Sequence, residues 1–112
     1  AGARHIPRLI AIVDYNRVQL SSRVDENLSL EPFAIKWEAF GWNVLSADGH
    51  NIADLLSVLS RAGAISERGP VVIIANTVKG KGVSFMEGKF EWHGKAPNDQ
   101  EYAAAMKELG SK

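Results

Sequence analysis

The sequence predicts an α/β fold in which helices pack on a parallel sheet. Two short runs, residues 9–13 and 71–75, are apolar at every position and rich in β-branched residues, as strands covered on both faces are. Two amphipathic helical patterns lie between these runs. Strands that alternate with helices of this length imply right-handed βαβ crossovers, and therefore parallel strands.

The elements are expected in the order β-α-β-α-β-loop-α. Pro32 suits the first turn of the first helix, and Asn51 precedes the apolar stripe of the second. Residues 43–46 match a middle strand, and Asn98 with Glu101 resembles a capping box that opens a last helix. The apolar positions that define the three helices are Phe33, Trp37 and Phe40; Ile52, Leu55, Leu56 and Leu59; and Tyr102, Met106 and Leu109.

Composition limits the classes of function. The chain has 112 residues, of which 46% are hydrophobic and 23% charged, and this fits one small globular domain or a subunit of something larger. Thirteen basic residues balance thirteen acidic ones, so no overall positive field attracts nucleic acid or an anionic membrane. The absence of cysteine excludes disulfides and thiolate metal sites. Without a signal-like N-terminus or a long apolar run, we expect a soluble, cytoplasmic protein.

The segment from Lys79 to Lys95 combines glycines, lysines and one histidine. Glycines let the backbone approach a ligand closely, and four lysines against two acids give the segment a net charge of +2. A mobile surface loop with solvated lysines is the alternative interpretation. We favour an anion site with acid-base chemistry beside it, because a solvated loop has no need of an aromatic, Trp92, fixed beside a histidine. His93 is the best catalytic candidate, since histidine is the residue type whose unperturbed charge change falls near neutral pH.

Polar residues also follow two of the predicted strands at their carboxyl ends, where ligands bind in open parallel sheets. Residues 14–19 follow the first strand and residues 76–82 follow the third. Ordinary turn chemistry is one explanation of Asp and Asn at such an end. The other is half of a magnesium site, in which the Asn16 amide oxygen and the Val18 carbonyl supply two oxygen ligands. Asp14 is the only carboxylate nearby.

Four motifs, taken in order along essentially the whole chain, are similar to successive landmarks of transketolase. Together they are far more specific than any one of them. The resemblance implies the three-layer α/β/α fold that binds thiamine diphosphate. Residues 1–112 would be the second half of the diphosphate-binding domain, and thus a partial domain. The motifs are Asp14-Tyr-Asn16-Arg-Val18, Glu38-Ala-Phe-Gly-Trp42, Asp48-Gly-His50, and Lys79-Gly-Lys-Gly82 continued by Trp92-His93-Gly-Lys95.

The resemblance also implies roles for single residues. Asn16 and the backbone carbonyl of Val18 match ligands of the Mg²⁺ or Ca²⁺ ion that anchors thiamine diphosphate. Lys79 and His93 match residues that line the cofactor and substrate channel, where the histidine helps stabilise the reacting sugar. Lys95 matches a lysine near the same channel in the animal-type variant of the motif.

Other parts of the family's site are absent from the sequence. Transketolases precede this segment with a Gly-Asp-Gly motif, whose aspartate binds the metal. The glutamate that activates the cofactor, and the pocket for its pyrimidine ring, belong to a further domain. We expect partner chains of a hetero-oligomer to carry these parts, and the isolated chain to be inactive.

The reaction implied by the resemblance is transfer of a two-carbon ketol unit from a ketose phosphate to an aldose. One alternative is a specialised thiamine-dependent ketol or acyl transferase of a biosynthetic pathway. Another is a non-catalytic assembly or regulatory subunit that retains the fold. The presence of Asn16, Lys79 and His93 weighs against the last of these, because an interaction module has no need to keep them.

Overall fold

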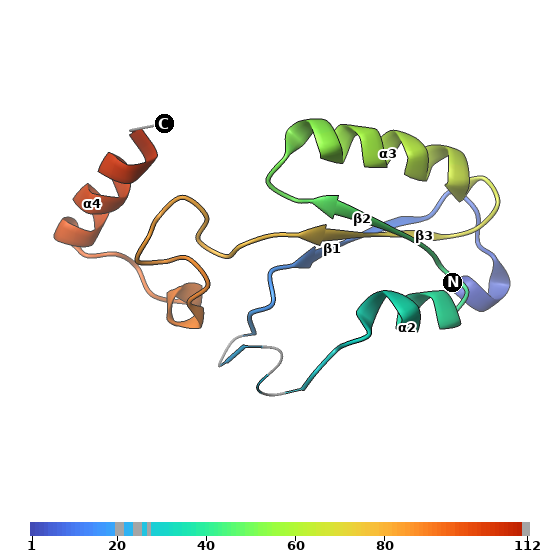
Figure 1. The fold of residues 1–112 in the computed structure, drawn as a ribbon, viewed down its shortest axis with the longest axis horizontal. Coiled ribbons are helices and arrows are strands. Elements are labelled where there is room, and N and C mark those ends of the chain that lie inside the picture. Colours follow the sequence, from blue (N-terminus) through green and yellow to red (C-terminus); the bar gives the residue numbers. More distant parts are fainter. Residues whose placement is uncertain (20–21, 24–25, 27, 111–112) are drawn as a thin grey trace. The chain divides into compact units, whose positions relative to one another are not determined.

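The computed structural model describes residues 1–19, 22–23, 26 and 28–110, and Figure 1 shows their path. These residues form two compact units. The first comprises residues 1–15 and 30–77, and the second comprises the described residues of 16–29 and 78–112. In the described part of the chain, no helix has both the length and the apolar character needed to cross a membrane.

The first unit is built on a parallel sheet of three strands, β1 (Ile10–Tyr15), β2 (Asn43–Asp48) and β3 (Val71–Asn76). The strand order is β1-β3-β2, so β3 pairs with both of the others. Ile12 and Leu45 both lie opposite Ile73 in the register. The predicted strands and their parallel arrangement are confirmed, with each strand ending one or two residues later than the sequence pattern suggests.

Two helices belong to this sheet, α2 (Phe33–Ala39) and α3 (Ile52–Ser66). Figure 1 shows them on opposite sides of the strands, which gives the expected order of layers. The side-chain oxygen of Asn51 accepts a hydrogen bond from the N–H of Asp54 at 3.1 Å and caps α3 as predicted. A short 3-10 helix, Gly2–Arg4, precedes β1.

The core of the first unit lies around β3, whose residues 71–75 are all buried. The cluster on the α3 side joins Val71 and Ile73 to Val58 and Ala62 of the helix. A fully buried side chain of this size stabilises the fold by roughly 1.5–3 kcal/mol. β3 is therefore the strand covered on both faces that the sequence predicts.

For β1, the same prediction is wrong in this structure. Ile10 and Ile12 are 37% and 58% exposed. The physical reason is the strand order: β1 lies at an edge of the sheet, and α3 packs chiefly on β2 and β3. The register puts Ile12 in the same row as Ile73, so its side chain is on the face that α3 covers only in part.

The second unit contains the 3-10 helix η2 (Phe90–His93) and the helix α4 (Asp99–Gly110). The capping box at the start of α4 is confirmed in both directions. The N–H of Glu101 donates to Asn98 Oδ1 at 2.9 Å, and the N–H of Asn98 donates to Glu101 Oε2 at 2.8 Å.

Candidate functional site

Polar side chains gather where the three parallel strands end. Asn76 Nδ2 donates hydrogen bonds to Ser46 Oγ at 3.0 Å and to the carbonyl of Ala47 at 3.3 Å. Thr77 Oγ1 donates to Asp14 Oδ1. The end of β3 is thus tied by side chains to both of its neighbours. The edge at which the sequence predicts ligand binding is held together by its own polar groups.

The turn after β2 is also held by its own side chains. Asp48 Oδ1 accepts from the N–H of His50 at 2.9 Å, and Asp54 Oδ2 accepts from the N–H of Asp48 at 2.8 Å. His50 itself is exposed. These contacts form an Asx turn that leads into a helix. They give no evidence that His50 binds a ligand.

Asn16 and Val18 form a tight turn directly after β1. Asn16 Oδ1 accepts a hydrogen bond from the N–H of Val18 at 2.9 Å, and Arg17 between them has a φ of 61°. A non-glycine residue in this left-handed region is uncommon and persists only where its surroundings fix it. An isolated antiparallel bridge pairs Val18 with Arg23. The turn therefore fixes the amide of Asn16 relative to the backbone of Val18.

This turn fits part of the magnesium site that the sequence predicts. An amide oxygen has two lone pairs, and the Val18 N–H uses one of those on Asn16, so the other remains for a cation. Asp14, the nearby carboxylate, accepts a hydrogen bond from Thr77. Among the described residues, no three His, Cys, Asp or Glu side chains cluster as metal ligands. This part of the chain thus offers neutral oxygen ligands and no carboxylate cluster.

The segment that begins at Lys79 folds back on itself. The N–H of Gly88 donates to the Lys79 carbonyl at 2.9 Å, and the N–H of Gly82 donates to Glu87 Oε1 at 2.9 Å. Lys81 Nζ lies 3.8 Å from the same carboxylate oxygen. One of the four lysines in the segment is therefore offset by a local acid, and the backbone forms a hydrogen-bonded turn.

The end of this segment is organised around Trp92. Its indole Nε1 donates to the carbonyl of Phe85 at 3.2 Å, and the two rings pack with centroids 5.5 Å apart. Lys95 Nζ lies 4.2 Å from the centroid of the Trp92 ring and donates to Glu101 Oε1 at 2.9 Å. His93, the last residue of η2, is exposed. The aromatic beside the histidine is thus held in place, as expected from the sequence.

The hydrogen bonds that Glu101 accepts shift the pKa of its carboxyl group. The hydrogen bond from Lys95, followed by that from the Asn98 backbone, lowers the pKa of Glu101 below its ordinary value of 4.5. The ion pair with Lys95 is therefore formed at neutral pH.

The structure places the five predicted site residues in the second compact unit. Contacts join Asn16 to Val18, and join Lys95 to the indole next to His93. Two partners of the loop were not predicted from the sequence: Glu108, and Glu101 in its contact with Lys95. The position of Glu101 in the predicted capping box was a signal from which its place near the loop could have been inferred. Nothing in the sequence indicates that Glu108 contacts the loop.

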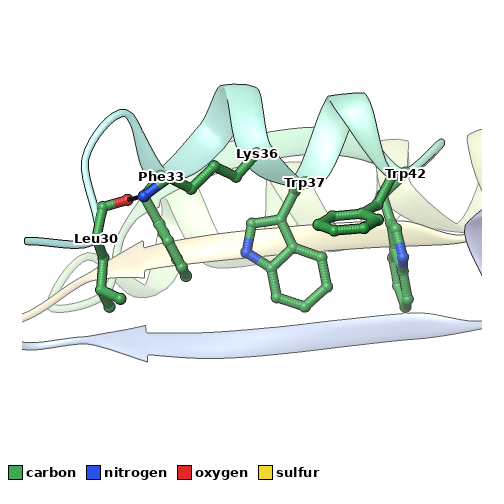
Figure 2. A pocket seen from close by; sticks show the side chains of 6 residues that line it. Leu30, Phe33, Lys36, Trp37 and Trp42 are labelled. Atoms are coloured by element: carbon green, nitrogen blue, oxygen red, sulfur yellow. Dashed lines mark hydrogen bonds between the residues drawn. The ribbon is translucent and has the colours of Figure 1, made fainter.

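A separate apolar hollow lies in the first unit, beside α2. Its volume is about 290 Å³, and Figure 2 shows the aromatic side chains that extend into it from the helix. Phe40 is 75% exposed, and Lys36 Nζ donates to the Leu30 carbonyl at 2.9 Å at the rim. The hollow carries no cluster of titratable groups and is lined by Leu30, Phe33, Lys36, Trp37, Phe40 and Trp42.

Comparisons with known proteins link this fold to one family. The sequence profile described as "Transketolase, thiamine diphosphate binding domain" matches residues 1–112. The chain is 42% identical over 109 residues to the 6-deoxy-6-sulfo-D-fructose transketolase subunit SqwG of Clostridium sp. (strain MSTE9), covering 97% of this chain and 39% of that protein. It is 37% identical over 107 residues to an apulose-4-phosphate transketolase subunit of Phocaeicola vulgatus, covering 96% of this chain and 38% of that protein.

The fold is similar to that of solved transketolases as well. The crystal structure of transketolase from Campylobacter jejuni subsp. jejuni NCTC 11168 superimposes with a TM-score of 0.86 at 28% identity, over 98% of this chain and 17% of that chain. This chain spans about two fifths of the length of the curated relatives named above.

Proposed function

Because the chain belongs to the transketolase family, within its thiamine diphosphate-binding domain, we propose that it acts as part of a multi-chain transketolase. The reaction is transfer of a two-carbon ketol unit from a ketose phosphate to an aldose acceptor. The observation that carries this proposal is the match over residues 1–112 together with the intact Asn16–Val18 turn. Residues 1–112 then form the second half of the diphosphate-binding domain.

In this proposal, the Asn16 amide oxygen and the Val18 carbonyl bind the Mg²⁺ or Ca²⁺ ion. Thiamine diphosphate, when bound, supplies the carbon–carbon bond chemistry, while the protein positions it and stabilises charge. Lys79 and Lys95 provide positive charge for the diphosphate and the sugar phosphate. His93 donates a hydrogen bond to the substrate oxygen that gains charge, and its exposure leaves the imidazole accessible to that substrate.

Partner chains would carry the Gly-Asp-Gly half of the domain and the pyrimidine-binding domain, which residues 1–112 do not contain. Two observations support a hetero-oligomer. The relatives with 42% and 37% identity are both named as transketolase subunits. Apolar surface is exposed on β1 and beside α2, notably at Ile12 and Phe40, and exposed patches of this kind mark interaction sites. We propose a cytoplasmic location for the assembly.

A second candidate is a transketolase specialised for one sugar. The names of the two bacterial relatives favour it, since one refers to 6-deoxy-6-sulfo-D-fructose and the other to apulose 4-phosphate. Assay of ketol transfer with these two sugars and with common ketose phosphates distinguishes a specialised enzyme from a general one.

The proposal is tested by titrating thiamine diphosphate, with Mg²⁺ present, into the purified chain and into the complex that copurifies with it. We expect binding to the complex and weak or no binding to the chain alone, because two neutral oxygens give the ion no protein charge to offset its dehydration. Micromolar binding by the chain alone would refute the need for a partner's carboxylate. A complex that neither binds the cofactor nor transfers ketol units would refute the proposed function.

A further inference from the structure

The helix α4 carries two glutamates that bind the loop containing His93. Glu101 and Glu108 are seven residues apart, which is close to two helical turns, so both lie on one face of α4. Glu108 accepts two hydrogen bonds from Ser84, at 2.6 Å from its N–H and 2.8 Å from its hydroxyl. Glu101 accepts one from Lys95 Nζ at 2.9 Å. The helix therefore holds the loop at two points, one near each end.

The contact at Glu101 also links the loop to the start of the helix. One carboxylate oxygen accepts from Lys95, while the other accepts from the N–H of Asn98 and closes the capping box. Lys95 in turn lies over the ring of Trp92, the residue next to His93. A displacement of Glu101 would thus release Lys95 from one of its two constraints and change the surroundings of the histidine.

We propose that α4 is a clamp for the segment from Ser84 to Lys95, with Glu101 and Glu108 as positioning residues for His93 and Lys95. The clamp itself rests on the contacts within the second unit. Only its importance for catalysis rests on the proposed function, through the roles of His93 and Lys95 in the cofactor and substrate channel.

Hydrogen exchange of residues 84–95, measured by mass spectrometry on the copurified complex, tests the clamp directly. Glu101→Gln keeps a capping residue, because glutamine also serves at this position, but removes the charge that holds Lys95. Its control is Asp99→Asn, which removes an equal charge from an exposed residue of the same helical turn. Glu108→Ala is compared with Gln100→Ala, also at an exposed position of α4.

We expect exchange in this segment to become about two- to fivefold faster in both glutamate variants, the range for partly exposed charged contacts, and to stay unchanged in the two controls. If the glutamate variants exchange like their controls, the clamp is wrong, whatever their activity.

A double-mutant cycle then separates the clamp from the proposed function. If Glu101 acts through Lys95, Glu101→Gln raises the apparent dissociation constant of thiamine diphosphate, and adding it to Lys95→Ala has no further effect. Additive effects would show that Glu101 does not position Lys95 for binding. If Lys95→Ala binds the cofactor normally while Glu101→Gln still loosens the loop, the clamp stands and the role proposed for Lys95 is refuted.

Discussion

Alanine substitutions at Gly80 and Gly88 distinguish two reasons for glycine in the loop that begins at Lys79. Both residues have left-handed backbones, with φ of +72° and +68°. A β-carbon added at Gly80 would lie 2.8 Å from both the β-carbon and the carbonyl oxygen of Met86, whereas one added at Gly88 would meet nothing within 4 Å. The two sites thus require the same backbone conformation, but only Gly88 has room for a β-carbon.

The expected magnitudes follow from this difference. The left-handed conformation costs an alanine about 1–2 kcal/mol at either position. At Gly80, the contact with the Met86 backbone adds a packing penalty of about 1–3 kcal/mol, because the backbone cannot move aside as a flexible side chain does. The total is then about 1–2 kcal/mol for Gly88→Ala and about 2–5 kcal/mol for Gly80→Ala.

Hydrogen exchange of residues 79–89 in the copurified complex measures these penalties. We expect exchange to become roughly 5- to 30-fold faster in Gly88→Ala, the factor that corresponds to its penalty, and faster again in Gly80→Ala. Gly94→Ala is the control, since its φ is −131° and an added β-carbon meets nothing within 4 Å. The apparent affinity for thiamine diphosphate should fall most in Gly80→Ala, because Lys79 is adjacent. Equal exchange in the Gly80 and Gly88 variants would refute the argument from the Met86 contact.

Four further substitutions test the site. His93→Ala should lower turnover by roughly a hundred- to a thousandfold, the usual loss of about 2.7–4 kcal/mol for a donor to a developing charge, whereas Lys79→Ala should mainly raise the apparent dissociation constant of the cofactor. Steady-state kinetics at several cofactor concentrations checks both predictions. Normal turnover in both variants would support the alternative interpretation, that the segment is a solvated surface loop. Asn16→Ala should weaken metal-dependent cofactor binding, with activity largely restored by excess Mg²⁺ and cofactor; a defect that persists at saturation would indicate another role. The depressed pKa of Glu101 means that its bonds stabilise the start of α4 at pH values above 4.5 and lose this effect as the pH falls through the folded pKa. NMR titration should give a pKa below 4.5 that moves toward that value in Lys95→Ala, and no movement would mean that Lys95 is not the cause.

Local sequence patterns predicted the elements of this fold well. The helix that follows Asn51 and the capping box of Asn98 and Glu101 depend on residues three or four positions apart. Such short-range patterns can be recognised from the sequence alone. The burial of β3 could be predicted for a similar reason, because every position of Val71–Asn76 except the last is apolar and buried.

Features that depend on distant residues could not be predicted in this way. The exposure of Ile12 follows from the position of β1 at the sheet edge, and strand order is not encoded in the spacing of apolar residues. The contact of Ser84 with Glu108 joins positions 24 residues apart, with a loop and a 3-10 helix between them. The motifs around Asn16 and His93 led to the predicted chemistry of the site, which stays a prediction, and they did not reveal what holds the loop in place.

The central position of β3 constrains how the sheet can assemble during synthesis. β1 and β2 leave the ribosome first, yet neither hydrogen-bonds to the other, and each finds its partner only when Val71 and the residues after it have been made. Until then both strands present unpaired backbone edges, which favour aggregation. Closing the loop from Ile10 to Val71 also costs conformational entropy before any contact compensates for it, so sheet formation should be slow and cooperative. Chains interrupted before residue 71 would therefore lack both strand pairings of the first unit, because β3 takes part in each of them.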